Sequence, residues 1–149
     1  MTALSIMVVG TIAIQRNEPL YIFGRAVTAI PTGSMIGDEE DSLDIGDLAI
    51  IKKGNYDEIE IGDVIVFQQK VSDDLYILVI HRVIDIDEQG LVTKGDANTS
   101  ADQGFVTEDE FQGVYVSKIT WLRPIVTVIT TSLGKTVIFG LITIILLGL

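Results

Sequence analysis

Ser34 and His81 are the two side chains of this 149-residue chain whose types could perform nucleophilic chemistry together. Ser34 follows Thr32 and Gly33, and glycine beside serine favours a sharp turn that exposes the hydroxyl. A serine hydroxyl is a poor nucleophile until a neighbouring base takes its proton. The chain has one histidine, so a histidine base can only be His81. Taken separately, Thr-Gly-Ser is common turn material and a lone histidine beside an apolar run is commonly a core residue.

Two carboxylates C-terminal to His81 are candidate partners for its imidazole. A histidine base needs an acceptor that fixes its tautomer and stabilises the imidazolium, and a carboxylate serves best. Asp96 lies in a Gly-Asp-Ala-Asn segment, and Asp102 follows shortly after it. Asp96 and Asn98 could equally build an Asx turn. The residues alone therefore leave both carboxylates open.

Taken together and in order, these segments resemble the signal peptidase I family. The matching motifs are spread over most of the chain: Thr32-Gly33-Ser34-Met35, residues 62–67, His81-Arg82-Val83, and residues 94–98 followed by Asp102. Residues 20–24 (LYIFG) are also similar to the bacterial members. Histidine before Arg-Val indicates the branch shared by the endoplasmic reticulum, archaea and some Gram-positive bacteria, because lysine stands at that position in the other branch.

The resemblance implies a membrane-bound serine endopeptidase that removes signal peptides from secretory preproteins. It implies Ser34 as the nucleophile and His81 as the general base. By family position, Asp102 is the orienting acid and Asp96 a supporting carboxylate. The Ser34 backbone N–H and the Thr32 hydroxyl would stabilise the oxyanion. No cofactor and no metal ion are expected.

The resemblance also implies how the substrate binds. An extended segment at the end of a signal peptide would add to an exposed strand edge, with small residues at the first and third positions before the cut. Met35 and nearby apolar residues are expected to line the substrate pockets. Tethering to the bilayer would concentrate the enzyme near its membrane-confined substrate. We therefore expect a cell-membrane protein with an extracytoplasmic catalytic domain, bacterial or archaeal rather than eukaryotic, whose accessory subunits are left open.

The segment after Met35 departs from the family pattern, which usually has a proline two residues further on. Ile36 and Gly37 follow instead, and then an acidic run at residues 38–41. We interpret residues 36–41 as a short insertion, which leaves the backbone after the serine without the restriction of a proline. The acidic run could bind a divalent cation, but a solvated loop is the simpler interpretation.

The segments that must position these residues are typical of β-strands. Val, Ile and Tyr are frequent in four stretches separated by turns, at residues 48–51, 64–68, 75–87 and 113–122. Residues 85–91 resemble a hairpin connection. On a strand, His81 shares a face with Val79 and Val83, whereas Arg82 points the other way. We predict a mainly β fold with one catalytic domain over residues 20–122.

Apolar segments flank this domain. Residues 3–14 would form a helix about 18 Å long, short of the roughly 30 Å hydrocarbon core of a bilayer. We interpret residues 1–19 as an N-terminal apolar anchor and linker, the remnant of a spanning helix rather than an interfacial segment. A helix that starts at Pro124 and an apolar run to Leu149 predict a C-terminal membrane helix region at residues 123–149. A buried helix in a soluble protein is the alternative.

The composition bears on other classes of protein. Acidic residues outnumber basic ones 21 to 10, for a net charge of −11, so no nucleic-acid partner is expected. The absence of cysteine excludes disulfides, zinc–thiolate sites and cysteine nucleophiles. Three rival functions stay open: a non-catalytic signal-peptidase-like assembly or chaperone protein for surface filaments, a self-cleaving regulator with a similar β core, and a membrane-tethered β module that binds a partner. The intact Ser34, His81 and Asp102 argue against the first, and the acidic charge against the second.

Overall fold

The computed structural model describes residues 19, 21–73 and 75–130, with side chains in the last helix described as far as Val128. Within these residues the elements follow the order β1 (Arg25–Ala29), β2 (Leu48–Lys52), the 3-10 helix η1 (Tyr56–Glu58), β3 (Val64–Ser72), β4 (Leu75–Asp87), β5 (Gly90–Lys94), β6 (Phe111–Ile119) and α2 (Arg123–Thr130). The predicted fold class, a mainly β single domain, is confirmed for this part of the chain.

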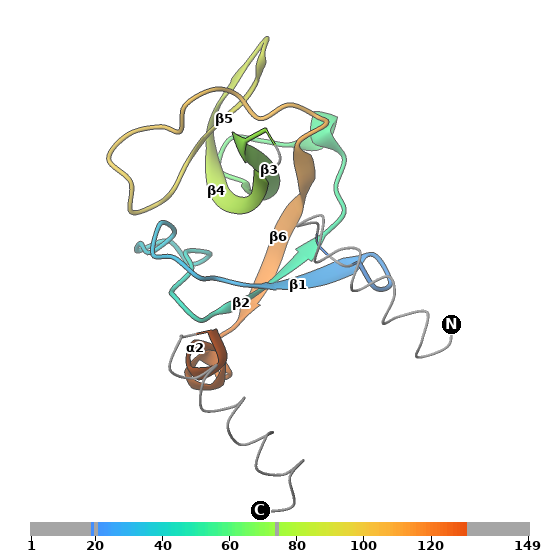
Figure 1. Ribbon diagram of the computed structural model, residues 1–149. Coiled ribbons are helices and arrows are strands. Elements are labelled where there is room, and N and C mark those ends of the chain that lie inside the picture. The colour runs from blue at the N-terminus through green and yellow to red at the C-terminus, as the bar shows by residue number, and fades with distance from the viewer. Residues whose placement is uncertain (1–18, 20, 74, 131–149) are drawn as a thin grey trace, which may run out of the picture.

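The described strands form one antiparallel sheet in the order β1-β2-β6-β3-β4-β5. Strand β6 joins the two halves, because its C-terminal part pairs with β2 and its N-terminal part with β3. In Figure 1 it runs from the β3–β5 group at the top to β1 and β2 below. The strand that leads into Ser34 and the strand that carries His81 therefore belong to opposite halves of the sheet.

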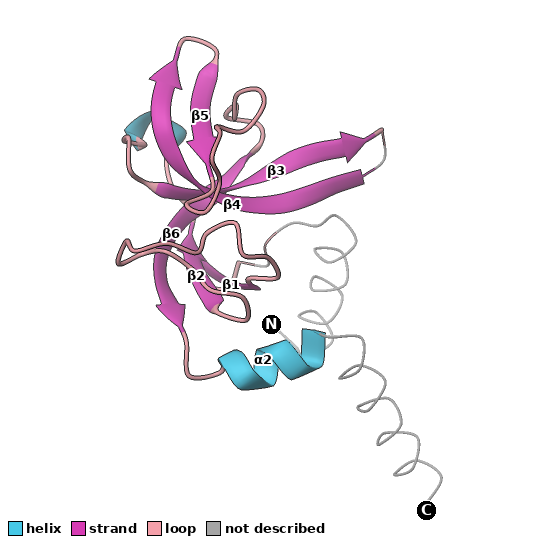
Figure 2. Ribbon diagram, turned by 90° about the vertical axis from the view of Figure 1, so that its left-hand side faces the viewer, coloured by secondary structure: helices cyan, strands magenta, loops and turns pink. Residues whose placement is uncertain are grey.

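Strand β4 has two partners along its length. Up to Arg82 it pairs with β3, and from Arg82 onward it pairs with β5. Figure 2 shows the far ends of β3 and β4 extending away from the sheet as a two-stranded arm. His81 lies where the pairing changes from one partner to the other. Because side chains alternate along a strand, His81 and Arg82 face opposite sides of the sheet.

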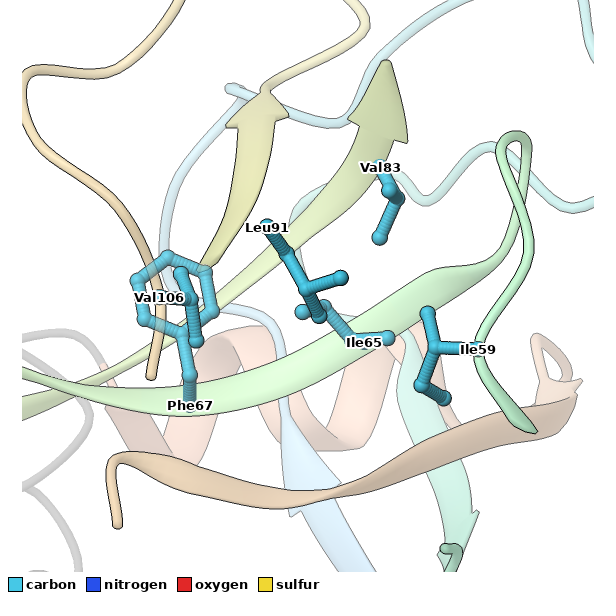
Figure 3. Packing of buried hydrophobic residues seen from close by; sticks show 6 residues of the cluster. All are labelled: Ile59, Ile65, Phe67, Val83, Leu91 and Val106. Carbon is cyan, nitrogen blue, oxygen red and sulfur yellow. The ribbon is translucent and has the colours of Figure 1, made fainter. Parts of the chain in front are cut away.

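Two buried clusters support the two segments that carry the candidate residues. The cluster on the His81 side of β3 and β4 contains Ile59, Ile65, Phe67, Val83, Leu91 and Val106, which converge on one another in Figure 3. The ring of Phe67 meets the His81 ring edge to face, with 6.4 Å between ring centres. A second cluster, which includes Ile30, Met35 and Leu43, lies under the serine segment. Each large apolar side chain buried in this way contributes about 1.5–3 kcal/mol.

Helix α2 is held against the loop before β2 by an ion pair. Arg123 Nε and Nη2 donate to Asp47 Oδ1 at 2.9 and 2.8 Å. Asp47 is fully buried, so its charge requires such a partner. Gly46, at φ +88°, lies so close to the helix that a Cβ would collide with Thr127. The glycine therefore permits the close approach that the ion pair holds.

The predicted strands were confirmed unevenly. The strand at residues 75–87 is confirmed at both ends, and those at 48–51 and 64–68 extend further, to Lys52 and Ser72. The prediction of 113–122 was wrong at both ends, since the strand is Phe111–Ile119. The predicted hairpin connection at 85–91 was too long. Strands β4 and β5 are paired up to Asp87 and Gly90, so the connection is only the turn between these two residues. Strands β1 and β5 were not predicted.

The predicted terminal anchors lie largely outside the described residues. Helix α2 begins at Arg123, one residue before the predicted start at Pro124. No helix within residues 21–73 and 75–130 has the length and apolar character needed to span a bilayer. The anchors at 1–19 and 123–149, and the domain boundaries drawn from them, stay predictions.

Candidate active site

Ser34 lies on a turn whose neighbours on both sides are fixed. Before it, Ile30 is buried and makes two backbone hydrogen bonds to the loop before β2, at 2.9 and 2.8 Å. After it, Met35 is 1% exposed and packs in the second core cluster. The Ser34 side chain itself is half-buried, and its Oγ lies 3.4 Å from Thr32 Oγ1. The Ser34 hydroxyl is thus accessible to solvent, while the backbone on both sides of it is held in place by buried neighbours.

Asp102 lies against the imidazole of His81. The His81 Nδ1 and Asp102 Oδ2 atoms are 2.5 Å apart, and His81 is 8% exposed. A carboxylate at Nδ1 favours a proton on that nitrogen, which leaves Nε2 as the basic atom. Of the two carboxylates left open by the sequence, the structure places Asp102 at the histidine.

Thr93 holds Asp102 in this position, and the sequence analysis did not identify it. The fully buried Thr93 hydroxyl donates to Asp102 Oδ2 at 2.7 Å, and the Asp102 N–H donates to the Thr93 carbonyl at 2.8 Å. Thr93 belongs to β5, opposite Val83 of β4. Because β5 was not predicted as a strand, no sequence signal placed this threonine beside the histidine.

Gly95 is the point at which the serine segment and the histidine approach each other. A Cβ on Gly95 would lie 2.5 Å from the Ser34 carbonyl oxygen and 3.0 Å from His81 Nε2. The next turn also holds the serine, because the Ala97 N–H donates to the Ser34 carbonyl at 2.9 Å. Only a residue without a side chain fits between the two groups. Among the described residues, no hydrogen bond joins the Ser34 hydroxyl to the imidazole.

Ser34 and His81 line one cavity of about 570 Å³. One wall is the end of β1 and the segment after it, from Thr28 to Met35. The opposite wall is the Ile77–His81 stretch of β4. Thr32 and Met35, the other two residues predicted for this site, are both part of the lining. The cavity therefore brings the predicted nucleophile, base, oxyanion group and pocket residue to one space between the two halves of the sheet.

Asp96 lies on the other face of β4, with Arg82. Arg82 Nε and Nη2 donate to the two oxygens of Asp96 at 2.9 and 2.8 Å, and the Ser42 hydroxyl donates to Asp96 Oδ2 at 2.6 Å. Burial raises the pKa of Asp96, but the hydrogen bonds from Arg82 and Ser42 outweigh it and leave that pKa below its ordinary value. The same carboxylate raises the pKa of Arg82. Of the two carboxylates, Asp96 thus contacts the guanidinium and not the imidazole.

The acidic run after Met35 is partly integrated into this network. Residues 38–40 are exposed, as expected of a solvated loop. Asp41 is partly exposed and also accepts hydrogen bonds from Arg82 Nη1 and Nη2 at 3.0 and 2.7 Å. The solvated-loop interpretation therefore holds for residues 38–40 and omits the ion pair of Asp41. Within the described chain, no cluster of three or more His, Asp and Glu side chains has the arrangement to hold a metal ion.

No family model matches the chain. The chain is similar to signal peptidase I W of Bacillus subtilis (strain 168), with 34% identity over 104 residues, which is 66% of this chain and 50% of that protein. The chain thus spans about half the length of the curated relative it matches. The similarity supports the resemblance to signal peptidase I that the motifs carry.

Proposed function

We propose that this chain is a signal peptidase I of the histidine type, a serine endopeptidase in which Ser34 is the nucleophile, His81 the general base and Asp102 the orienting acid. The observation that carries the proposal is the placement of the imidazole. Its Nδ1 contacts Asp102, and its Nε2 lies beside the Ser34 segment at Gly95. The similarity to signal peptidase I W supports the signal peptidase I part of the proposal.

In this mechanism, Ser34 Oγ attacks the scissile carbonyl carbon as His81 Nε2 takes the hydroxyl proton. The negative charge of Asp102 stabilises the imidazolium that forms. The imidazolium then gives the proton to the leaving amine, and a water molecule activated by His81 hydrolyses the acyl–enzyme. The hydroxyl–imidazole hydrogen bond forms when substrate fills the cavity, since such bonds are often long in an empty site.

The oxyanion of the tetrahedral intermediate is stabilised by the Ser34 backbone N–H and the Thr32 hydroxyl. The 3.4 Å between Thr32 Oγ1 and Ser34 Oγ supports this role, because it puts the second hydroxyl beside the reacting oxygen. Losing one donor of this kind commonly costs about 2.7–4 kcal/mol of transition-state stabilisation. Asp96 takes no part in proton transfer and supports the site through Arg82.

The proposed substrate is the end of a signal peptide on a secretory preprotein. The cavity supports an extended peptide, because it lies between the sheet-edge strand β1 and the exposed arm of β4. Met35 lies in its lining and contributes to the pocket for the substrate side chains. The protein would act at the extracytoplasmic face of a bacterial or archaeal cell membrane, anchored by its apolar ends. It needs no cofactor and no nucleic acid.

The test is mass spectrometry of a secretory preprotein incubated with the full chain in detergent. Wild type is expected to cut after a small residue, and Ser34→Ala to abolish the cut, because no other group replaces the nucleophile. Ser117→Ala, an exposed serine of β6, is the matched control and should cut normally. Cleavage that survives in Ser34→Ala ends the proposal. Preprotein binding without cleavage by wild type would instead favour the non-catalytic assembly or chaperone role.

A further inference from the structure

The loop that follows the serine is closed on itself at its base. Residues 36–42 leave the core after Met35 and return to it at Leu43, which is fully buried. The Leu43 N–H donates to the Met35 carbonyl at 2.7 Å, so the two ends of the loop are joined. A displacement of this loop would therefore move Met35 and the preceding residue, Ser34.

The residues of the loop do not restrict its own backbone. Gly37 has no side chain, and no proline occurs between Met35 and Leu43. Gly37 is nevertheless packed tightly, because a Cβ there would lie 2.9 Å from Ser42 Oγ and 3.1 Å from Asp96 Cβ. Something other than local backbone preference must hold the loop in this close contact.

Asp41 provides one such attachment through Arg82, beside the hydrogen bonds of the Ser42 hydroxyl to Asp96 and of Lys118 to the Ser42 carbonyl. The two carboxylate oxygens of Asp41 accept hydrogen bonds from Arg82 Nη1 and Nη2, the paired geometry that is strongest between these groups. The side chains are 37% exposed in Asp41 and 17% exposed in Arg82, so solvent weakens the pair without removing it. Arg82 immediately follows His81 on β4, and the same guanidinium binds Asp96. The loop after the nucleophile is thus bound to the strand that carries the base.

We propose that Asp41 is a positioning residue that latches the 36–42 loop to β4 and so holds Ser34 in register with His81. This inference rests on the proposed function for its catalytic consequence. The latch itself is a property of the fold and is measurable without substrate. The contacts at Ala97 and Leu43 keep part of the restraint when Asp41 is changed, so the effect is a loss of precision rather than of the site.

The test compares Asp41→Asn, Asp41→Glu and Asp38→Asn in the full chain in detergent. Asp38→Asn removes the same charge from an exposed position of the same loop and is the matched control. For Asp41→Asn, kcat for a preprotein should fall by about 10-fold with KM nearly unchanged, because a small displacement of a reacting group is costly while substrate contacts persist. Asp41→Glu should recover most of the loss, and Asp38→Asn should match wild type.

Amide hydrogen exchange gives a second readout that does not depend on activity. Opening of the latch should speed exchange of the Leu43 amide by about 10-fold in Asp41→Asn and leave it unchanged in Asp38→Asn. Exchange at Leu43 equal in the two variants would overturn the latch. Faster exchange with an unchanged kcat would overturn the positioning role. If wild type does not cleave at all, the proposed function fails, and the Leu43 exchange alone then supports or rejects the latch.

Discussion

Asp96 and Asp102 lie on the same loop after β5, but each contacts a different kind of basic side chain. Asp102 contacts His81, whose imidazole is a candidate to accept and donate the proton in catalysis. Asp96 contacts Arg82, a group that remains charged at all physiological pH values. The two partners are consecutive residues of β4, and their side chains face opposite sides of the sheet. One strand therefore separates the carboxylate suited to proton chemistry from the carboxylate suited to holding the fold.

The hydrogen bonds received by each carboxylate fit this division. Asp96 accepts two from Arg82 and one from the Ser42 hydroxyl, and all three donors favour the ionised form. The described hydrogen bonds to Asp102 Oδ2 come from the Thr93 hydroxyl and from His81. Of these two partners only the imidazole can change its charge, so the interaction between Asp102 and His81 depends on whether the imidazole is protonated. The partner, rather than the position on the loop, therefore distinguishes the two acids.

The strongest challenge to this division is Asp102→Asn. Activity on a preprotein should fall by about 10³–10⁴-fold, because an amide in place of the carboxylate favours the wrong histidine tautomer and does not stabilise the imidazolium. The measurement is kcat for the preprotein. Thermal unfolding of the same sample is the control, and it should show that the variant is folded. Asp96→Asn serves as the comparison, with a much smaller change in kcat per folded molecule. Equal losses from the two substitutions would abolish the distinction between the acids.

The second effect is on stability and should appear in Asp96→Asn. Its carboxylate is 9% exposed and its hydrogen bonds involve charged groups, so their loss should cost about 1–3 kcal/mol of unfolding free energy. Arg82 keeps Asp41 as a partner, which limits the cost. Urea unfolding measures it, with Asp109→Asn, an exposed carboxylate, as the control. An unchanged urea midpoint would show that Asp96 is not a structural acid.

The pH dependence of stability should follow Asp96 as well. Its pKa in the folded protein lies below the ordinary value of 3.8. The stability that this carboxylate contributes is therefore fully present above that value and is lost as the pH falls through the lower folded-state pKa. The unfolding free energy of wild type should fall more steeply than that of Asp96→Asn as the pH drops from about 5 toward 3. Parallel curves for the two proteins in a series of urea titrations would contradict the pKa shift.

The sequence predicted the motif-bearing parts of the fold well where local pattern and tertiary pairing agree. The long apolar run of β4 predicts a strand by itself, and the structure keeps both of its ends. Strand β1 has the short sequence RAVTA and exists because it pairs with β2 over its whole length. Strand β5 follows a tight turn at Glu88 and Gln89 and is held by β4, whose Asp-containing end would be a poor strand alone. Pairing of this kind is not visible in local composition.

The site shows the same limit. Ser34, His81 and Asp102 were predicted as site residues from residue types and motif order, and the structure brings them to one region. Thr93 and Asp41 were not found as site residues, because each depends on a partner distant in sequence. A buried threonine in a strand and an aspartate in an acidic run carry no chemical signal until the fold places them beside Asp102 and Arg82. Their contribution is therefore best examined by removing single polar groups.

The smallest predicted effect comes from Thr93→Val, which removes a single hydroxyl from the Asp102 side of the comparison. Valine fills nearly the same volume, so packing in β5 is kept, while Asp102 Oδ2 loses the hydrogen bond of 2.7 Å. A net bond of this kind is worth about 1 kcal/mol, so kcat should fall about 5-fold with KM unchanged. Thr107→Val is the matched control. It also removes one hydroxyl, which donates to Glu110 at 3.0 Å, and it lies outside the cavity. A kcat in Thr93→Val equal to that of the control would mean that the Thr93 hydroxyl does not position Asp102.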